Sequence, residues 1–136
     1  LQYIFNELPE VNAIIHTHQP YATAVGLIGD TFPAALTTLA NVTLGAINVA
    51  PYCSAASLDM GVQSVKYLGG KRAVILKHHG VIAVGGNLKE ALYAAIYMEE
   101  AAKAYLAAKA AGDVAIMTDE QTRDAVEIHK TYGQGH

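Results

Sequence analysis

Short apolar runs of strand type alternate with segments of helical spacing, and this alternation limits the possible folds more than any other feature of the chain. Val74, Ile75 and Leu76 form a continuous apolar run within 72–77, which indicates a strand buried on both faces. Strands are also predicted at 11–18, 46–50 and 81–84, and helices at 1–8, 21–28, 54 or 57 to 68, 87–111 and 118–132. The segment 31–42 is compatible with a helix or with extended chain. The mixed order predicts an α/β domain.

Two of the predicted helices begin with the residue pattern of a capping box. Asn87 stands three residues before Glu90, and Thr118 stands three residues before Gln121. A short polar side chain at the first position and a carboxylate or amide at the other satisfy backbone N–H groups that a helix start leaves unpaired. The sequence therefore predicts helix starts at Asn87 and Thr118.

The size and charge of the chain favour one domain and exclude two classes of partner. With 136 residues and 52% hydrophobic content, we expect residues 1–136 to form a single domain or most of one. The 9 basic and 12 acidic residues give a net charge of −3, the opposite of the basic surplus that a nucleic-acid backbone requires. Charged residues and histidines interrupt the apolar stretch 69–86, so we expect no membrane span.

The cysteine content and the first residues of the chain allow two further predictions, on the cellular compartment and on whether the domain is complete. Cys53 is the single cysteine, which permits no internal disulfide, and no segment has the form of a secretory signal. We therefore expect a cytoplasmic protein, with Cys53 as a small buried hydrophobic residue. The first predicted helix has no capping residue before Leu1. We interpret the chain as lacking an N-terminal part.

The histidines are the residues most capable of chemistry. His16 and His18 are two apart on a predicted strand, so their side chains share one face and can bind one metal ion. A catalytic zinc typically has three protein ligands and an open fourth position. His78 and His79, where a strand ends against a glycine, are both candidates for the third ligand. His129, in a predicted surface helix, and His136, in the tail, are interpreted as solvated.

Several motifs in a fixed order resemble the class II aldolase/adducin family. They are the segments 16–22 (His-Thr-His-Gln-Pro-Tyr-Ala), 50–52 (Ala-Pro-Tyr), 76–81 (Leu-Lys-His-His-Gly-Val) and 87–91 (Asn-Leu-Lys-Glu-Ala). The tail 130–133 (Lys-Thr-Tyr-Gly) also resembles the aldolases of that family. The resemblance covers essentially the whole chain and implies a three-layer αβα domain with a largely antiparallel central sheet. It makes 1–136 the C-terminal two-thirds of such a domain, truncated at its N-terminus.

The resemblance also implies site residues and a reaction. It assigns His16, His18 and His79 as zinc ligands, with His78 as their neighbour, and Tyr132 as a catalytic residue that donates a proton near the aldehyde. The implied activity is a zinc-dependent retro-aldol cleavage of a sugar phosphate to dihydroxyacetone phosphate and an aldehyde, in a homotetramer with active sites at subunit boundaries. The acid/base glutamate and the phosphate-binding segments of the family lie upstream of the paired histidines and are not in this sequence.

Three alternatives stay open. Two are enzymes with the same ligands, namely L-ribulose-5-phosphate 4-epimerase and methylthioribulose-1-phosphate dehydratase. The third is a non-catalytic binding module like the head domain of adducin. Retention of three clustered imidazoles argues for an enzyme, because a scaffold has no physical need for them. The sequence does not determine the substrate or distinguish zinc from other divalent ions.

Overall fold

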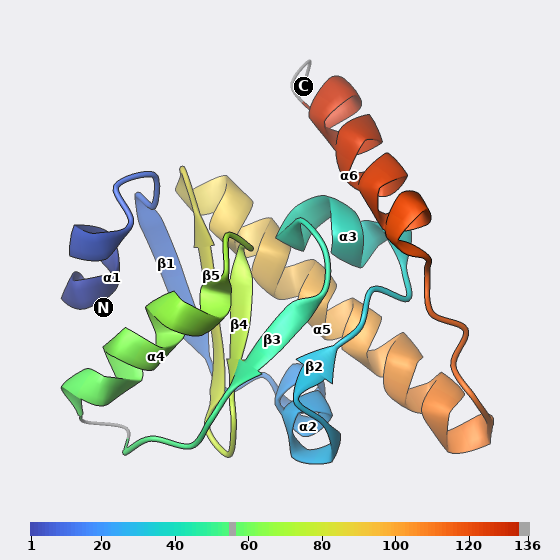
Figure 1. Cartoon of the computed structure of the whole chain (residues 1–136), viewed down its shortest axis with the longest axis horizontal. Helices are drawn as coiled ribbons and strands as arrows, with labels where there is room; N and C mark the ends of the chain where they lie inside the picture. Colours follow the sequence, from blue (N-terminus) through green and yellow to red (C-terminus); the bar gives the residue numbers. More distant parts are fainter. Residues whose placement is uncertain (55–56, 134–136) are drawn as a thin grey trace.

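A computed structural model describes residues 1–54 and 57–133, with side chains through residue 128, and contains a five-stranded sheet in the order β1-β5-β4-β3-β2 (Figure 1). The strands are β1 (Ala13–Thr17), β2 (Thr31–Phe32), β3 (Ile47–Ala50), β4 (Ala73–Leu76) and β5 (Gly80–Gly85). All neighbouring pairs are antiparallel except β3 and β4, which are parallel. The largely antiparallel sheet that the resemblance implies is confirmed.

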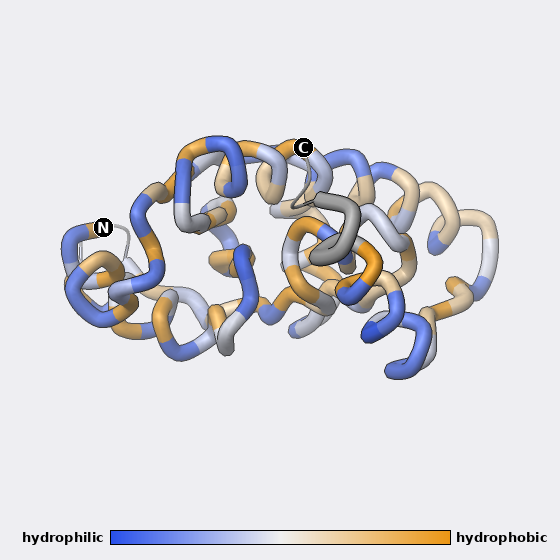
Figure 2. Tube along the Cα trace, turned by 90° about the horizontal axis from the view of Figure 1, so that it is seen from above, coloured by the Kyte–Doolittle hydropathy of each residue, from blue (hydrophilic) through white to orange (hydrophobic). Residues whose placement is uncertain are grey.

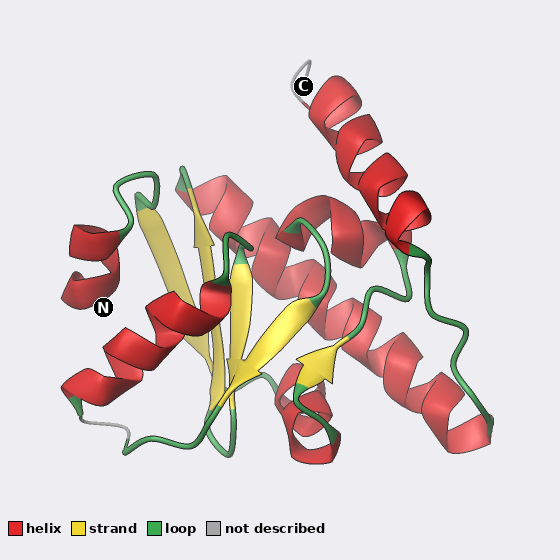
Figure 3. Cartoon of the chain, in the orientation of Figure 1, coloured by secondary structure: helices red, strands yellow, loops and turns green. Residues whose placement is uncertain are grey.

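Helices cover both faces of this sheet, which gives the three predicted layers (Figure 3). One face carries α1 (Gln2–Glu7) and α4 (Leu58–Leu68), and the other carries α2 (Pro20–Ile28), α3 (Thr37–Thr43) and α5 (Leu88–Ala111). The last helix, α6 (Asp119–Gly133), packs against α3 and extends beyond the sheet (Figure 1). Along the helices the tube in Figure 2 alternates between hydrophobic and hydrophilic residues, as expected where one helix face meets the sheet.

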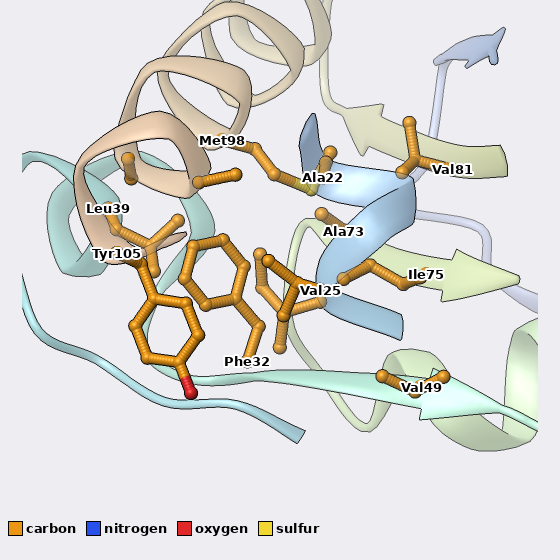
Figure 4. Packing of buried hydrophobic residues seen from close by; sticks show 13 residues of the cluster. Ala22, Val25, Phe32, Leu39, Val49, Ala73, Ile75, Val81, Met98 and Tyr105 are labelled. Atoms are coloured by element: carbon orange, nitrogen blue, oxygen red, sulfur yellow. The ribbon is translucent and has the colours of Figure 1, made fainter. Parts of the chain in front are cut away.

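The core is divided by the sheet. On the α2 and α5 side, Figure 4 shows Val25, Met98 and Phe32 among the side chains packed around the strands. At this interface a Cβ on Gly26 of α2 would lie 2.7 Å from Ile75 Cγ2, so the glycine allows α2 to approach β4 closely. All four residues of β4 are buried, which confirms the interpretation of its apolar run. The glycine therefore lets α2 pack directly against the sheet.

The predicted helix starts are confirmed at both capping boxes. The Glu90 N–H donates to Asn87 Oδ1 at 2.9 Å, and the Gly86 N–H donates to Glu90 Oε1 at 2.8 Å. Thr118 and Gln121 exchange the corresponding pair of bonds. Of the two starts considered for the fourth helix, Ser57 holds the cap position, although its side chain makes no capping bond.

Two expectations need correction. The first predicted strand is shorter than 11–18: β1 ends at Thr17, so His18 lies just beyond the strand. The segment 31–42 is neither all helix nor all extended, since it contains β2, a connection and most of α3. Tyr93 and Tyr97 of α5 lie outside the core, with 44% and 40% of their surface exposed. Within 1–54 and 57–133, no helix has the length and hydropathy needed to cross a membrane.

Candidate metal centre

His16 lies on β1, where backbone pairing with β5 fixes its position. The strand register places His16 opposite Ile82, and its ring Nδ1 lies 2.9 Å from the Val81 carbonyl oxygen. A carbonyl can only accept, so the imidazole donates from Nδ1 and Nε2 keeps its lone pair when the ring is neutral. A hydrogen bond of this kind commonly orients a metal-binding histidine. Nε2 of His16 is thus presented as a ligand atom.

His79 reaches the same point from the turn between β4 and β5. Its N–H donates to the Leu76 carbonyl at 3.0 Å, and His78 at the centre of the turn has a φ of 65°, in the left-handed region. The turn directs the His79 ring towards β1, where its Nε2 lies 3.1 Å from Nε2 of His16. Tetrahedral zinc with Zn–N bonds of about 2.0–2.1 Å holds two such nitrogens about 3.3 Å apart, close to the separation here.

Gly80 allows β5 to approach the end of β1 closely. A Cβ on Gly80 would collide with the Thr17 carbonyl oxygen and would lie 3.0 Å from Cδ2 of His18. No side chain fits there without moving the end of β1. The glycine after the paired histidines is therefore needed for the close approach that forms the cluster.

His18 completes the group. It lies one residue past β1, is exposed, and its ring centroid lies 5.4 Å from that of His16 and 5.0 Å from that of His79. One ring nitrogen from each of the three histidines lies within 4.8 Å of the other two. The structure thus brings together all three histidines that the resemblance assigns, and the group is consistent with a divalent metal site of the family.

The lowered pKa of His79 favours metal binding. Partial burial, followed by the nearby His16 and His18 rings, lowers the pKa of His79 from its ordinary value of 6.5. A cationic imidazole cannot ligate, so a lowered pKa keeps more of the ring in the ligating form near neutral pH. Three facing imidazoles without a carboxylate in the group form a site suited to a cation.

The other candidates lie apart from the cluster. His78 is exposed and its ring faces Tyr52, with the centroids 6.1 Å apart, so it is not a member of the group. Cys53 is partly exposed, which corrects the buried interpretation. Desolvation and the hydrogen bond to Asp59 raise the pKa of the Cys53 thiol, and this disfavours the nucleophilic thiolate.

The Tyr132 side chain lies outside the described side chains, as do His129 and His136, so their roles are untested. The backbone of α6 leads away from the histidines: β1 ends and β5 begins at the lower end of the sheet in Figure 1, whereas α6 ends at the top. Within one chain, the end of α6 and the histidine cluster are on opposite sides of the molecule.

Two residues beside the cluster were not singled out from the sequence. Gln19 Nε2 donates to the Ala95 carbonyl at 2.9 Å, and a carboxylate oxygen of Glu99 accepts the Ala22 N–H at 2.8 Å. Both contacts join the segment after His18 to α5. No local pattern announces them, because their partners are backbone groups 76 and 77 residues away.

The chain is similar in sequence to known proteins along nearly its whole length. The sequence pattern of the class II aldolase and adducin N-terminal domain matches residues 2–106. The chain belongs to the class II aldolase and adducin family. The L-fuculose phosphate aldolase of Escherichia coli (strain K12) is 32% identical over 130 residues, which cover 95% of this chain and 60% of that enzyme. A 5-methylthioribulose-1-phosphate/5-deoxyribulose-1-phosphate aldolase of Rhodospirillum rubrum is 30% identical over 130 residues, covering 96% and 59%.

A solved structure of an L-fuculose 1-phosphate aldolase superposes with a TM-score of 0.87 at 30% identity, over 94% of this chain and 62% of that one. The family fold is therefore shared across nearly the whole chain. The chain spans about 60% of the length of the relatives it matches.

Proposed function

We propose that this chain provides the metal site of a zinc-dependent class II aldolase, with His16, His18 and His79 as the three protein ligands. The observation that carries the proposal is the convergence of three imidazole nitrogens within 4.8 Å, with Nδ1 of His16 occupied by the Val81 carbonyl. Neutral imidazoles suit zinc, and three ligands with an exposed side at His18 leave a position open for substrate.

The proposed reaction is the retro-aldol cleavage of a sugar phosphate of the L-fuculose 1-phosphate kind to dihydroxyacetone phosphate and an aldehyde. A bound zinc ion would act as a Lewis acid for the negative charge that develops when the carbon–carbon bond breaks. His16 and His79 would hold their ligand nitrogens towards the ion through the β1–β5 pairing and the β4–β5 turn.

Further parts of the proposal concern the whole protein. We assign Tyr132 as the proton donor near the aldehyde, and we propose a homotetramer located in the cytoplasm, with 1–136 as one domain. The direction of α6 is compatible with Tyr132 serving the site of a neighbouring subunit, as active sites at subunit boundaries require. The acid/base glutamate would come from the part of the family domain that precedes the paired histidines.

The test begins with metal content. The protein is freed of metal with a chelator, loaded with zinc, desalted and measured by elemental analysis, beside the His16→Ala variant. About one zinc per chain, lost in the variant, supports the assigned ligands. Absence of zinc from both the chain and the full-length protein would instead favour a binding module of the adducin kind.

The substrate test uses the full-length enzyme and measures release of dihydroxyacetone phosphate. The substrates are L-fuculose 1-phosphate, 5-methylthioribulose 1-phosphate and 5-deoxyribulose 1-phosphate. The last two are named for the Rhodospirillum rubrum relative, which is 30% identical to this chain, compared with 32% for the Escherichia coli L-fuculose phosphate aldolase. Conversion of L-ribulose 5-phosphate to its epimer, or loss of water from methylthioribulose 1-phosphate, without cleavage, would replace the aldolase proposal with one of these two related reactions.

A further inference from the structure

The three histidines of the cluster are held in place to different degrees. His16 lies within β1 and its ring donates to Val81, while His79 lies in a turn closed by its own N–H. His18 lies beyond the last residue of β1, and within the described part of the chain no hydrogen bond holds its ring. The position of His18 therefore depends on how the backbone is fixed on either side of it.

On the side before His18 the backbone is fixed by the sheet, since Thr17 pairs with Val81 of β5. On the side after it, side chains make the connection. The Thr17 hydroxyl donates to Gln19 Oε1 at 2.6 Å, and Gln19 Nε2 donates to the Ala95 carbonyl of α5 at 2.9 Å. Gln19 thus links the end of β1 to a long, well-packed helix.

Glu99, one turn further along α5, fixes the start of α2. Its carboxylate accepts the Ala22 N–H at 2.8 Å and the Tyr21 N–H at 3.2 Å. These are N–H groups that a helix start leaves unpaired, and Pro20 before them has no N–H to satisfy. Gln19 holds the cap position of α2 without a capping bond from its side chain, so Glu99 performs that role from another helix. A carboxylate also interacts favourably with the positive end of the helix dipole.

We propose that Glu99 is a positioning residue for metal binding, because it anchors α2 three residues after His18 and so keeps His18 within reach of His16 and His79. The inference rests on the proposed function, since it presupposes that the three histidines bind one ion. Glu99 touches none of the three rings and would act only through the backbone of the segment 18–22. Groups that hydrogen-bond a metal ligand directly typically change metal affinity by about 10–100-fold, and we take this range as the scale of the effect expected for Glu99.

The experiment is a titration of the metal-free chain with Co²⁺, whose visible absorption reports the ligand geometry, in the wild type and three single variants. Glu99→Ala should weaken Co²⁺ binding about 10–100-fold. Glu99→Gln should recover part of the loss, because its amide oxygen can still accept one N–H. Glu100→Gln is the matched control: Glu100 is the next residue, is exposed, and pairs with Lys103 on its own helix, so binding should not change. Thermal unfolding of the metal-free variants is measured in parallel.

A double-variant comparison separates positioning from general destabilisation. If Glu99 acts through His18, Glu99→Ala should cause no further loss in a His18→Ala background, where two histidines still bind Co²⁺ weakly. An equal loss in both backgrounds, or unchanged affinity in Glu99→Ala, would overturn the inference while the proposed function stands. A wild-type chain that binds no Co²⁺ would overturn both.

Discussion

The two ends of the central strands carry polar groups of opposite character. At one end, His16, His18 and His79 face one another with their ring nitrogens, and two of these nitrogens lie 3.1 Å apart. At the other end, past Gly85 of β5, Arg72 pairs with Glu90 at 3.4 Å. The histidine cluster presents ligand nitrogens to one another, whereas at the other end the charges of Arg72 and Glu90 neutralise each other.

Two hollows that the described residues form lie away from the histidines. One of about 320 Å³ lies at the Arg72 end, and one of about 630 Å³ lies between α3 and α6. The first is lined largely by apolar residues around the Arg72–Glu90 ion pair, whose two charges already face each other. Facing ligand atoms that need a cation are a better guide to function here than the volume of a hollow.

Removal of one ligand should have the largest effect. His79→Ala should abolish tight zinc binding, a greater loss than the roughly 10–100-fold expected for a supporting group, because only two ligands are left. Circular dichroism should show that the strands persist, and a zinc titration measures the affinity.

The control for this variant is His78→Asn, in the same turn. Asparagine tolerates the left-handed backbone found at His78, whose exposed ring lies outside the cluster. Zinc stoichiometry unchanged in His79→Ala, or lost in His78→Asn, would show that the ligand set is wrong.

A methyl group added at Gly80, where β5 approaches the end of β1, should have the next largest effect. Gly80→Ala places a Cβ against the Thr17 carbonyl and 3.0 Å from the His18 ring, so β1 must shift. We expect a loss of about 1–3 kcal/mol in the free energy of unfolding, as for other overpacked sites, together with weaker zinc binding. Urea unfolding and a zinc titration measure the two losses.

Gly86→Ala, beyond the other end of the same strand, is the matched control. Its Cβ would meet only the end of the flexible Glu90 side chain at 3.2 Å, apart from a backbone oxygen at 3.9 Å. Zinc affinity should be unchanged. Equal loss of affinity in both glycine variants would remove the distinction between the two ends.

Disruption of the Arg72–Glu90 end of the strands should lower the free energy of unfolding without affecting zinc binding. Glu90→Ala removes the acceptor of the Gly86 N–H and the partner of Arg72. We expect a loss of about 1–2 kcal/mol in the free energy of unfolding, typical of a lost helix cap. Zinc affinity, measured by the same titration, should stay within a factor of about two of the wild type. A clear loss would mean that this end also supports the metal site.

Much of this arrangement could be predicted from local patterns. The capping boxes at Asn87 and Thr118 and the buried run of β4 follow from residue types a few positions apart, and all are confirmed. The choice between His78 and His79 did not follow from spacing, because it depends on which ring the turn directs towards β1.

The contacts that support the histidines could not be predicted from neighbouring residues either, because they join segments far apart in the sequence. The Val81 carbonyl has no side-chain signature, and Glu99 caps a helix 77 residues earlier in the chain. The end of β1 was also misplaced, because the strand ends at Thr17 and the chain begins α2 at Pro20. These features depend on the fold and become visible only when the strands are paired.

The smallest expected effect is on the pH dependence of stability of the metal-free chain. Burial and the neighbouring rings lower the pKa of His79 below its ordinary value of 6.5. Well above pH 6.5 this histidine is neutral in both the folded and the unfolded chain, and it adds no pH dependence. As the pH falls below 6.5, the unfolded chain binds a proton that folded His79 resists, so stability should decrease until the lowered pKa is passed.

Unfolding in urea at pH 7.5, 6.5 and 5.5, without metal, measures this slope. His79→Ala should be less sensitive to the change from pH 6.5 to 5.5 than the wild type, whereas His78→Asn should retain the wild-type slope. An unaltered slope in His79→Ala would mean that the facing imidazoles do not resist protonation. In that case the contrast between the two ends of the sheet would rest on geometry alone, because the surroundings of His79 would not disfavour its protonated form.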